Sequence, residues 1–138
     1  MTILDTNVVS ELMKPAPSPA VMQWASAQPS SNVAIPTVAL AEIHYGLERL
    51  PAGKRRAELE RRFALFLARG FAGRVLAFDD EAARIYGKIV AAREKAGRPV
   101  DAFDAMIAAI ARSQKAIVAT QDIAGFWGCG VKLVNPFV

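Results

Sequence analysis

The chain has 138 residues, a length that suits one domain with one hydrophobic core. Hydrophobic residues make up 53% of the sequence and charged residues 22%, a balance that excludes an intrinsically disordered chain. The formal net charge of +4 at pH 7 favours an anionic partner such as nucleic acid, although charge alone does not identify one.

The cysteine content and the first residues indicate the compartment. Cys129 is the only cysteine, so no disulfide can form within the chain. Residues 1–5 have neither the basic segment nor the long apolar segment of a secretory signal, and we therefore expect a cytoplasmic protein. The uncharged stretch 15–41 contains five prolines and many polar residues, which excludes a membrane-spanning helix there. We expect a loop, a short helix, a second loop and a strand instead.

Short apolar runs alternate with segments of helical periodicity along the chain. Runs that are apolar on both faces are typical of a parallel sheet covered by helices on both sides. We therefore predict a three-layer α/β fold with a central, mostly parallel sheet of about five strands, in a single domain that spans residues 1–138. The expected strands cover residues 2–4, 33–35, 74–78, 115–120 and 131–134.

Start and stop signals delimit the longer helices. Thr37 is expected to cap one helix, and Gly70 is expected to end the next, which carries apolar residues at helical spacing. Asp79 or Asp80 is expected to cap a long helix that closes at Gly97. The first two of these helices are expected to cover residues 37–50 and 54–69, and a further helix is expected over residues 101–114.

Four acidic residues stand at the ends of these expected elements. Asp5 follows the first strand, and Asp122 follows the run 115–120; each could equally be a helix N-cap. Glu42 lies among apolar neighbours in the second turn of its helix, where a carboxylate must reach solvent or find a partner such as a cation. Asp104 could serve the helix dipole behind an N-cap at Asp101.

Taken together, the four acids indicate a metal site. Side chains that follow the carboxyl ends of parallel strands meet at one edge of the sheet, where such sheets bind ligands. Several carboxylates at one point cannot all stay ionised without a cation. Oxygen ligands without histidine or cysteine select Mg²⁺ or Mn²⁺ over zinc, and such ions activate water for attack on a phosphodiester. The only histidine, His44, is two positions from Glu42 and therefore on another helix face, so we interpret it as structural.

Five short motifs follow one another over essentially the whole chain: LDTNVVSE at 4–11, TVALAE at 37–42, FDAMIAA at 103–109, ATQD at 119–122 and GVKLVNPF at 130–137. In this order they resemble the PIN-domain ribonucleases, and within them the VapC toxins of bacterial toxin–antitoxin pairs, nearest the FitB-like branch. The resemblance implies a PIN fold and a Mg²⁺- or Mn²⁺-dependent endoribonuclease that leaves a 5′-phosphate and a 3′-hydroxyl. It also implies a homodimer and a cognate antitoxin that occupies a groove.

The resemblance also implies roles for individual residues. The catalytic and metal-binding acids of the family carry over to Asp5, Glu42, Asp104 and Asp122, and the supporting residues to Thr6, Asn7 and Thr120. Many relatives have arginine where Gln121 stands, and some carry an acid near Gly125. The basic residues Lys54, Arg55 and Arg56 are either a solvated helix face or a contact for RNA or antitoxin.

Two alternative functions stay open from the residues. A phosphoaspartyl phosphohydrolase would use Asp5 as nucleophile, but that class wants a second aspartate two residues on, where this chain has Asn7. A non-catalytic PIN-fold binding module would keep the fold for partner or RNA contacts, and the complete set of acids argues against it.

Overall fold

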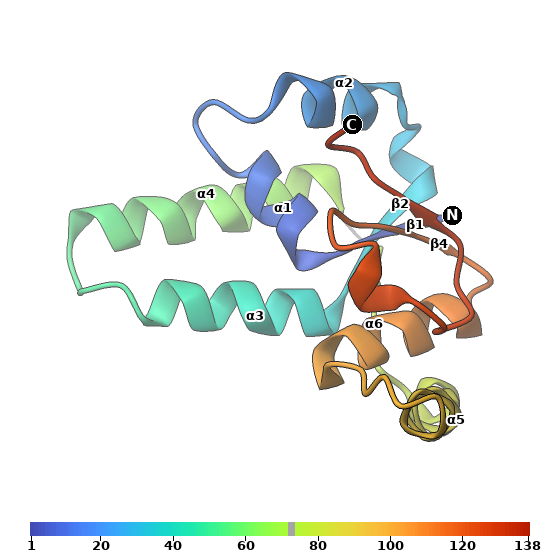
Figure 1. The fold of residues 1–138 in the computed structure, drawn as a ribbon. Coiled ribbons are helices and arrows are strands. Elements are labelled where there is room, and N and C mark those ends of the chain that lie inside the picture. Colours follow the sequence, from blue (N-terminus) through green and yellow to red (C-terminus); the bar gives the residue numbers. More distant parts are fainter. Residues whose placement is uncertain (72–73) are drawn as a thin grey trace.

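The structure is a computed structural model that describes residues 1–71 and 74–138. Short parallel strands alternate with helices, as Figure 1 shows. The strands are β1 (Thr2–Leu4), β2 (Val33–Pro36), β3 (Val75–Leu76), β4 (Ile117–Ala119) and β5 (Leu133–Val134). The helices are α1 (Thr6–Leu12), α2 (Pro19–Ala27), α3 (Thr37–Glu48), α4 (Lys54–Gly70), α5 (Asp80–Lys95) and α6 (Ala102–Ser113), with short 3₁₀ turns η1 (Ser30–Asn32) and η2 (Ala124–Phe126).

All five strands form one parallel sheet in the order β3-β2-β1-β4-β5. Strand β1 is central, with Ile3 opposite Ala34 of β2 and opposite Val118 of β4. The sheet order changes direction at β1, so the carboxyl ends of β1 and β4 form the edge where open sheets of this kind bind ligands. The predicted fold is confirmed, with strands β3, β4 and β5 shorter than expected.

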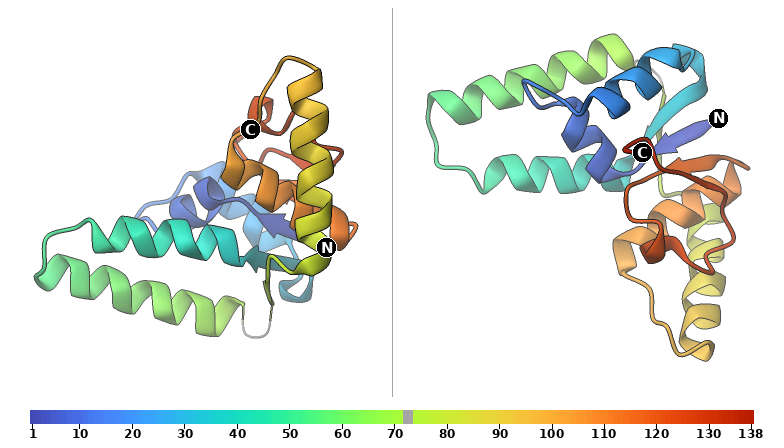
Figure 2. Two further views of the ribbon diagram at one scale, coloured as in Figure 1. Left: turned by 90° about the horizontal axis from the view of Figure 1, so that it is seen from below. Right: turned by 45° about the horizontal axis from the view of Figure 1, so that its top comes forward.

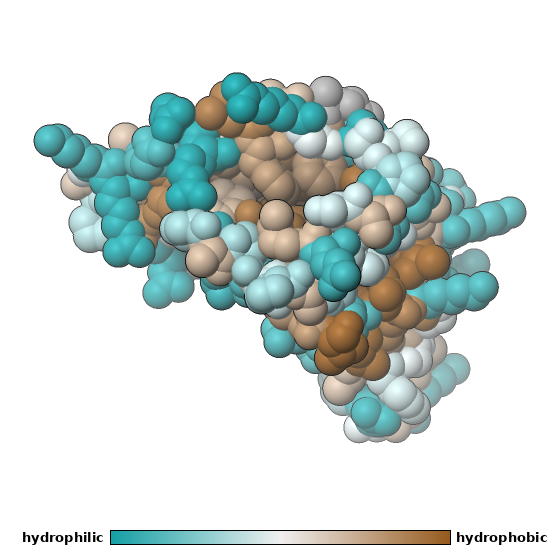
Figure 3. All heavy atoms as spheres, turned by 90° about the horizontal axis from the view of Figure 1, so that it is seen from above, coloured by the Kyte–Doolittle hydropathy of each residue, from teal (hydrophilic) through white to brown (hydrophobic). Residues whose placement is uncertain are grey.

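Helices cover both faces of the sheet. Successive strand residues point to opposite faces, so Ile3 joins the core formed with α5 and α6, whereas Leu4 joins the core formed with α1, α3 and α4. Figure 2 shows α5 and α6 on one side of the strands and the α3–α4 hairpin projecting on the other side. The tip of that hairpin carries mostly hydrophilic residues (Figure 3).

Helix starts follow the expected capping with one correction. Asp79 caps α5, because its Oδ1 accepts from Ala82 N at 2.9 Å, and Asp101 caps α6. The prediction that Thr37 caps α3 is wrong. Pro36 holds the cap position, and the Thr37 hydroxyl accepts instead from Phe78 N at 3.3 Å, which ties α3 to the segment after β3.

The uncharged stretch 15–41 contains α2, η1 and β2, in line with the loop, helix and strand expected there. Within residues 1–71 and 74–138, none of the helices combines the length and apolar character that crossing a membrane requires.

Candidate metal and catalytic site

Asp5 lies where β1 ends and α1 begins, and it is only 5% exposed. Its Oδ1 accepts from Thr6 N at 2.8 Å, which makes it the N-cap of α1. Its Oδ2 accepts from Thr120 Oγ1 at 2.7 Å and from Asn7 Nδ2 at 3.0 Å. The capping and functional interpretations therefore coexist, because each oxygen of a carboxylate has two lone pairs.

Thr120 joins the end of β4 to Asp5. Its buried hydroxyl donates to Asp5 and accepts from Asp122 N at 3.0 Å and from Asn7 Nδ2 at 3.2 Å. Asn7 also accepts from Gln121 N through its Oδ1 at 3.1 Å. These bonds set the start of the loop after β4 against α1, and so they place Asp122 beside Asp5.

Glu42 reaches the same edge of the sheet from α3. Its Oε1 accepts from the Thr6 hydroxyl at 2.7 Å. Thr6 thus contacts two acids, since its N–H donates to Asp5 and its hydroxyl donates to Glu42. One residue of α1 connects carboxylates from two distant parts of the sequence.

Asp104 and Asp122 approach each other over Gly125. A Cβ atom at position 125 would lie 2.3 Å from Asp122 Oδ2 and 3.0 Å from Asp104 Oδ2. Asp122 Oδ1 also accepts from Gly125 N at 3.0 Å. Only glycine leaves room for both carboxylates at this place, and the sequence analysis did not identify that role.

The pKa of Asp104 shows that the acids lie close enough to repel one another. Burial, and after it the charges of Asp5, Asp101, Asp122 and Glu42, together raise the pKa of Asp104 to about 7. Burial also raises the pKa of Asp5, against the hydrogen bonds from Thr120 and Thr6, which lower it. Without a cation, the site relieves its repulsion by holding a proton.

The donor set fits a hard divalent cation. The four acids present oxygen atoms alone, and among the described residues none of them forms an ion pair with lysine or arginine. Within the same residues, no three acidic, histidine or cysteine side chains are already arranged to hold an ion. A bound ion would therefore have to draw these carboxylates closer together. It would also have to displace the proton that the raised pKa of Asp104 favours.

A pH-dependent stability follows from Asp104. Its pKa is about 7 in the folded protein and 3.8 for an ordinary aspartate, so the stability present below the lower pKa is lost as pH rises through the higher pKa. The variant Asp104→Asn removes this loss. In EDTA at about pH 8 it should melt roughly 3–6 °C above the wild type after allowance for solvent screening, and the gap should shrink near pH 5. Melting curves that coincide at both pH values would contradict this assignment.

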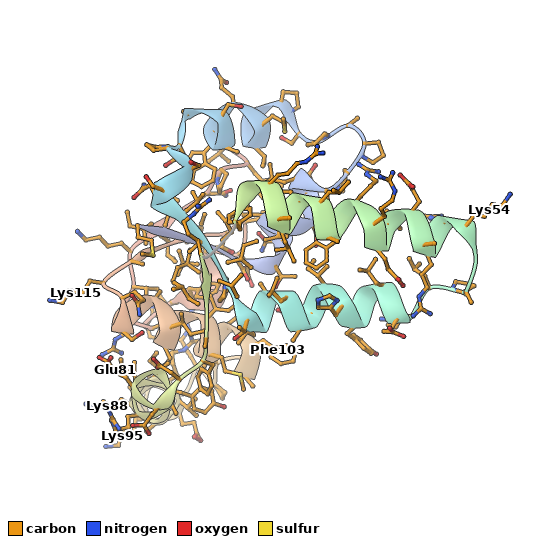
Figure 4. The ribbon with its side chains drawn as sticks, turned by 180° about the vertical axis from the view of Figure 1, so that it is seen from behind. Lys54, Glu81, Lys88, Lys95, Phe103 and Lys115 are labelled. Atoms are coloured by element: carbon orange, nitrogen blue, oxygen red, sulfur yellow. The ribbon has the colours of Figure 1, made fainter. Side chains whose placement is uncertain are left out.

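The other predicted residues lie farther from the acids or serve the fold. His44 is exposed and packs edge-on against Phe63, with ring centroids 5.3 Å apart. Lys54 lies at the tip of the α3–α4 hairpin and points away from the body of the molecule (Figure 4). Arg56 forms ion pairs with Glu48 and Glu60. Arg55, in contrast, lines a groove of about 430 Å³ together with Thr6 and Glu42.

A carboxylate cluster at the switch point of a parallel five-stranded sheet defines the class of protein. The chain belongs to the PIN domain family, whose model matches residues 2–125. It is 38% identical over 137 residues to the VapC ribonuclease Y4jK of Sinorhizobium fredii, covering 99% of this chain and 98% of that relative. It is 34% identical to the toxin FitB of Neisseria gonorrhoeae, covering 99% of both chains. The crystal structure of FitAcB from Neisseria gonorrhoeae aligns with a TM-score of 0.92 at 34% identity over 99% of each chain.

Proposed function

We propose that this protein is the endoribonuclease toxin of a toxin–antitoxin pair, and that Asp5, Glu42, Asp104 and Asp122 hold the divalent ion it uses. The observation that carries the proposal is the meeting of these carboxylates at one edge of the sheet without a basic partner among the described residues. The relatives named as a VapC ribonuclease and as a toxin support it over their full length.

The residues of the chain orient the acids for this chemistry. The chemistry that a divalent ion supplies here is activation of water and neutralisation of the charge that develops during in-line phosphoryl displacement. Thr120 and Asn7 donate to one oxygen of Asp5 and so set the plane of its carboxylate. Thr6 does the same for Glu42. The pKa of Asp104 is raised to about 7, so a cation that binds near neutral pH competes with a proton for this carboxylate.

Mg²⁺ or Mn²⁺ is the ion we propose, because hard oxygen donors without sulfur or nitrogen neighbours favour these ions. We also propose an antitoxin partner and a homodimer, as the resemblance to the VapC toxins implies. The groove that Glu42 and Arg55 line also contains apolar side chains, including Met13 just after α1, Ile43 of α3 and Leu59 of α4. A segment of the antitoxin in this groove would reach Glu42.

Removal of the metal tests the proposal. The purified protein is incubated with 5′-labelled RNA in Mg²⁺, in Mn²⁺, and in EDTA. We expect cleavage with either ion and a loss of at least about 10²-fold in EDTA that added Mn²⁺ restores. New fragments should accept a ligase adaptor that requires a 5′-phosphate. Equal cleavage in EDTA, or no cleavage with any ion, would rule the proposal out.

A further inference from the structure

Arg93 is a buried cation near the end of α5. It is 5% exposed, and it forms no ion pair within residues 1–71 and 74–138. A buried charge is costly unless hydrogen bonds compensate it, and here main-chain carbonyl groups provide the compensation. The sequence analysis did not single out this residue, and neither the metal site nor the core explains it.

The guanidinium group contacts two separate loops. Nε donates to Arg98 O at 2.6 Å and Nη2 donates to Pro99 O at 3.4 Å, both in the loop that leads into α6. Nη1 donates to Trp127 O at 2.6 Å and to Gly125 O at 3.3 Å, both in the loop that follows Asp122. One side chain thus joins the loop before Asp104 to the loop that holds Asp122 and Gly125.

We propose that Arg93 is a positioning residue for the metal site. Its guanidinium group holds these two loops in the relative position that brings Asp104 and Asp122 together over Gly125. The inference rests on the proposed function, because it assigns the arginine a role toward the same ion. Arg93 does not reach the acids itself; it acts through the carbonyl group of Gly125, whose Cα faces both carboxylates.

The role depends on the shape of the guanidinium rather than on its charge. A planar fork can donate in several directions at once, whereas a lysine ammonium is a point charge that cannot reach both loops. The packing around the group is equally specific. The Arg93 Cδ lies 3.4 Å from where a Cβ of Gly128 would sit, and the Trp127 ring centroid is 5.5 Å from its Cζ. Lysine would keep the charge and lose this geometry.

Metal titration without RNA tests the inference. Mn²⁺ is titrated by calorimetry into the wild type, Arg93→Lys and the control Arg74→Lys. Arg74 is a matched control because it also donates to main-chain carbonyls, those of Val33 and Gly70, next to β2. We expect Arg93→Lys to weaken Mn²⁺ binding by about 10- to 100-fold, and Arg74→Lys to lower the melting temperature without changing Mn²⁺ affinity.

The outcomes separate the two claims. If the wild type does not bind Mn²⁺, the proposed function fails. If the wild type binds and folded Arg93→Lys binds equally well, the positioning role is overturned. Should Arg93→Lys unfold, the wild type itself decides the matter by NMR. Saturating Mg²⁺ should shift the Nε–Hε resonance of Arg93 and leave that of Arg74 in place, and an unmoved Arg93 resonance would overturn the inference.

Discussion

Replacement of Asp5 by asparagine is expected to lower the rate of RNA cleavage by about 10³-fold or more, the largest effect of any single change in this chain. Loss of one charged ligand removes several kcal/mol of transition-state stabilisation, and each 1.36 kcal/mol is roughly a factor of ten in rate. Asp5 is the acid that the structure holds most firmly, through Thr6, Asn7 and Thr120. Its removal therefore cannot be compensated by a neighbouring carboxylate in the same place.

The fold should survive this substitution. Asparagine caps helices about as well as aspartate, so the bond from Thr6 N to position 5 is retained. Asp80→Asn is the matched control, because Asp80 lies exposed in the first turn of α5 and pairs there with Arg84. We expect Asp80→Asn to cleave like the wild type. An Asp5→Asn protein that is folded and cleaves RNA at the wild-type rate would refute the role of Asp5.

Replacement of Gly125 by alanine is also expected to have a large effect, on both cleavage and metal affinity. The new methyl group would stand 2.3 Å from Asp122 Oδ2, closer than a side-chain carbon atom comes to oxygen, and 3.0 Å from Asp104 Oδ2, which is a tight contact. The Asp122 carboxylate can swing away at little cost in stability, but it then leaves the site. We expect cleavage and Mn²⁺ affinity to fall by about 10- to 100-fold, with a melting temperature near that of the wild type.

Gly87→Ala provides the control for this change. Gly87 lies inside α5, where an added Cβ would meet no atom within 4 Å. Alanine favours helix, so this variant should be slightly more stable than the wild type, by about 0.5–1 kcal/mol, with unchanged cleavage. A Gly125→Ala protein with wild-type Mn²⁺ affinity would show that Asp104 and Asp122 do not act together over this glycine.

The elements of the fold and its class could be predicted from the sequence because their signals are local. Apolar runs and helix stop signals predicted β1, β2 and helices α3 to α6, and the edge of the sheet where Asp5 belongs followed from parallel topology alone. The order of the strands was not predictable, since it depends on contacts between segments far apart in the chain. Thr37 was assigned wrongly because its hydroxyl finds a partner in Phe78, which no local pattern indicates.

The residues of the candidate site also fall into those that the sequence predicts and those that only the structure reveals. The four acids could be selected from the sequence because Asp5, Asp104 and Asp122 lie near the ends of apolar elements and Glu42 is a charge among apolar neighbours within a helix. Gly125 and Arg93 could not be selected, because their roles depend on contacts between distant parts of the chain. Asp104 and Gly125 are 21 residues apart in the sequence, and Arg93 and Gly125 are 32 residues apart.

The most direct test of the carboxylate site is a crystal structure of the protein soaked in Mn²⁺, with anomalous diffraction recorded at the manganese edge. The account predicts an anomalous peak in contact with carboxylate oxygens of Asp5 and Asp104, with Glu42 or Asp122 turned toward it. Peaks only at other places on the protein, or no peak near Asp5 in crystals saturated with Mn²⁺, would contradict it.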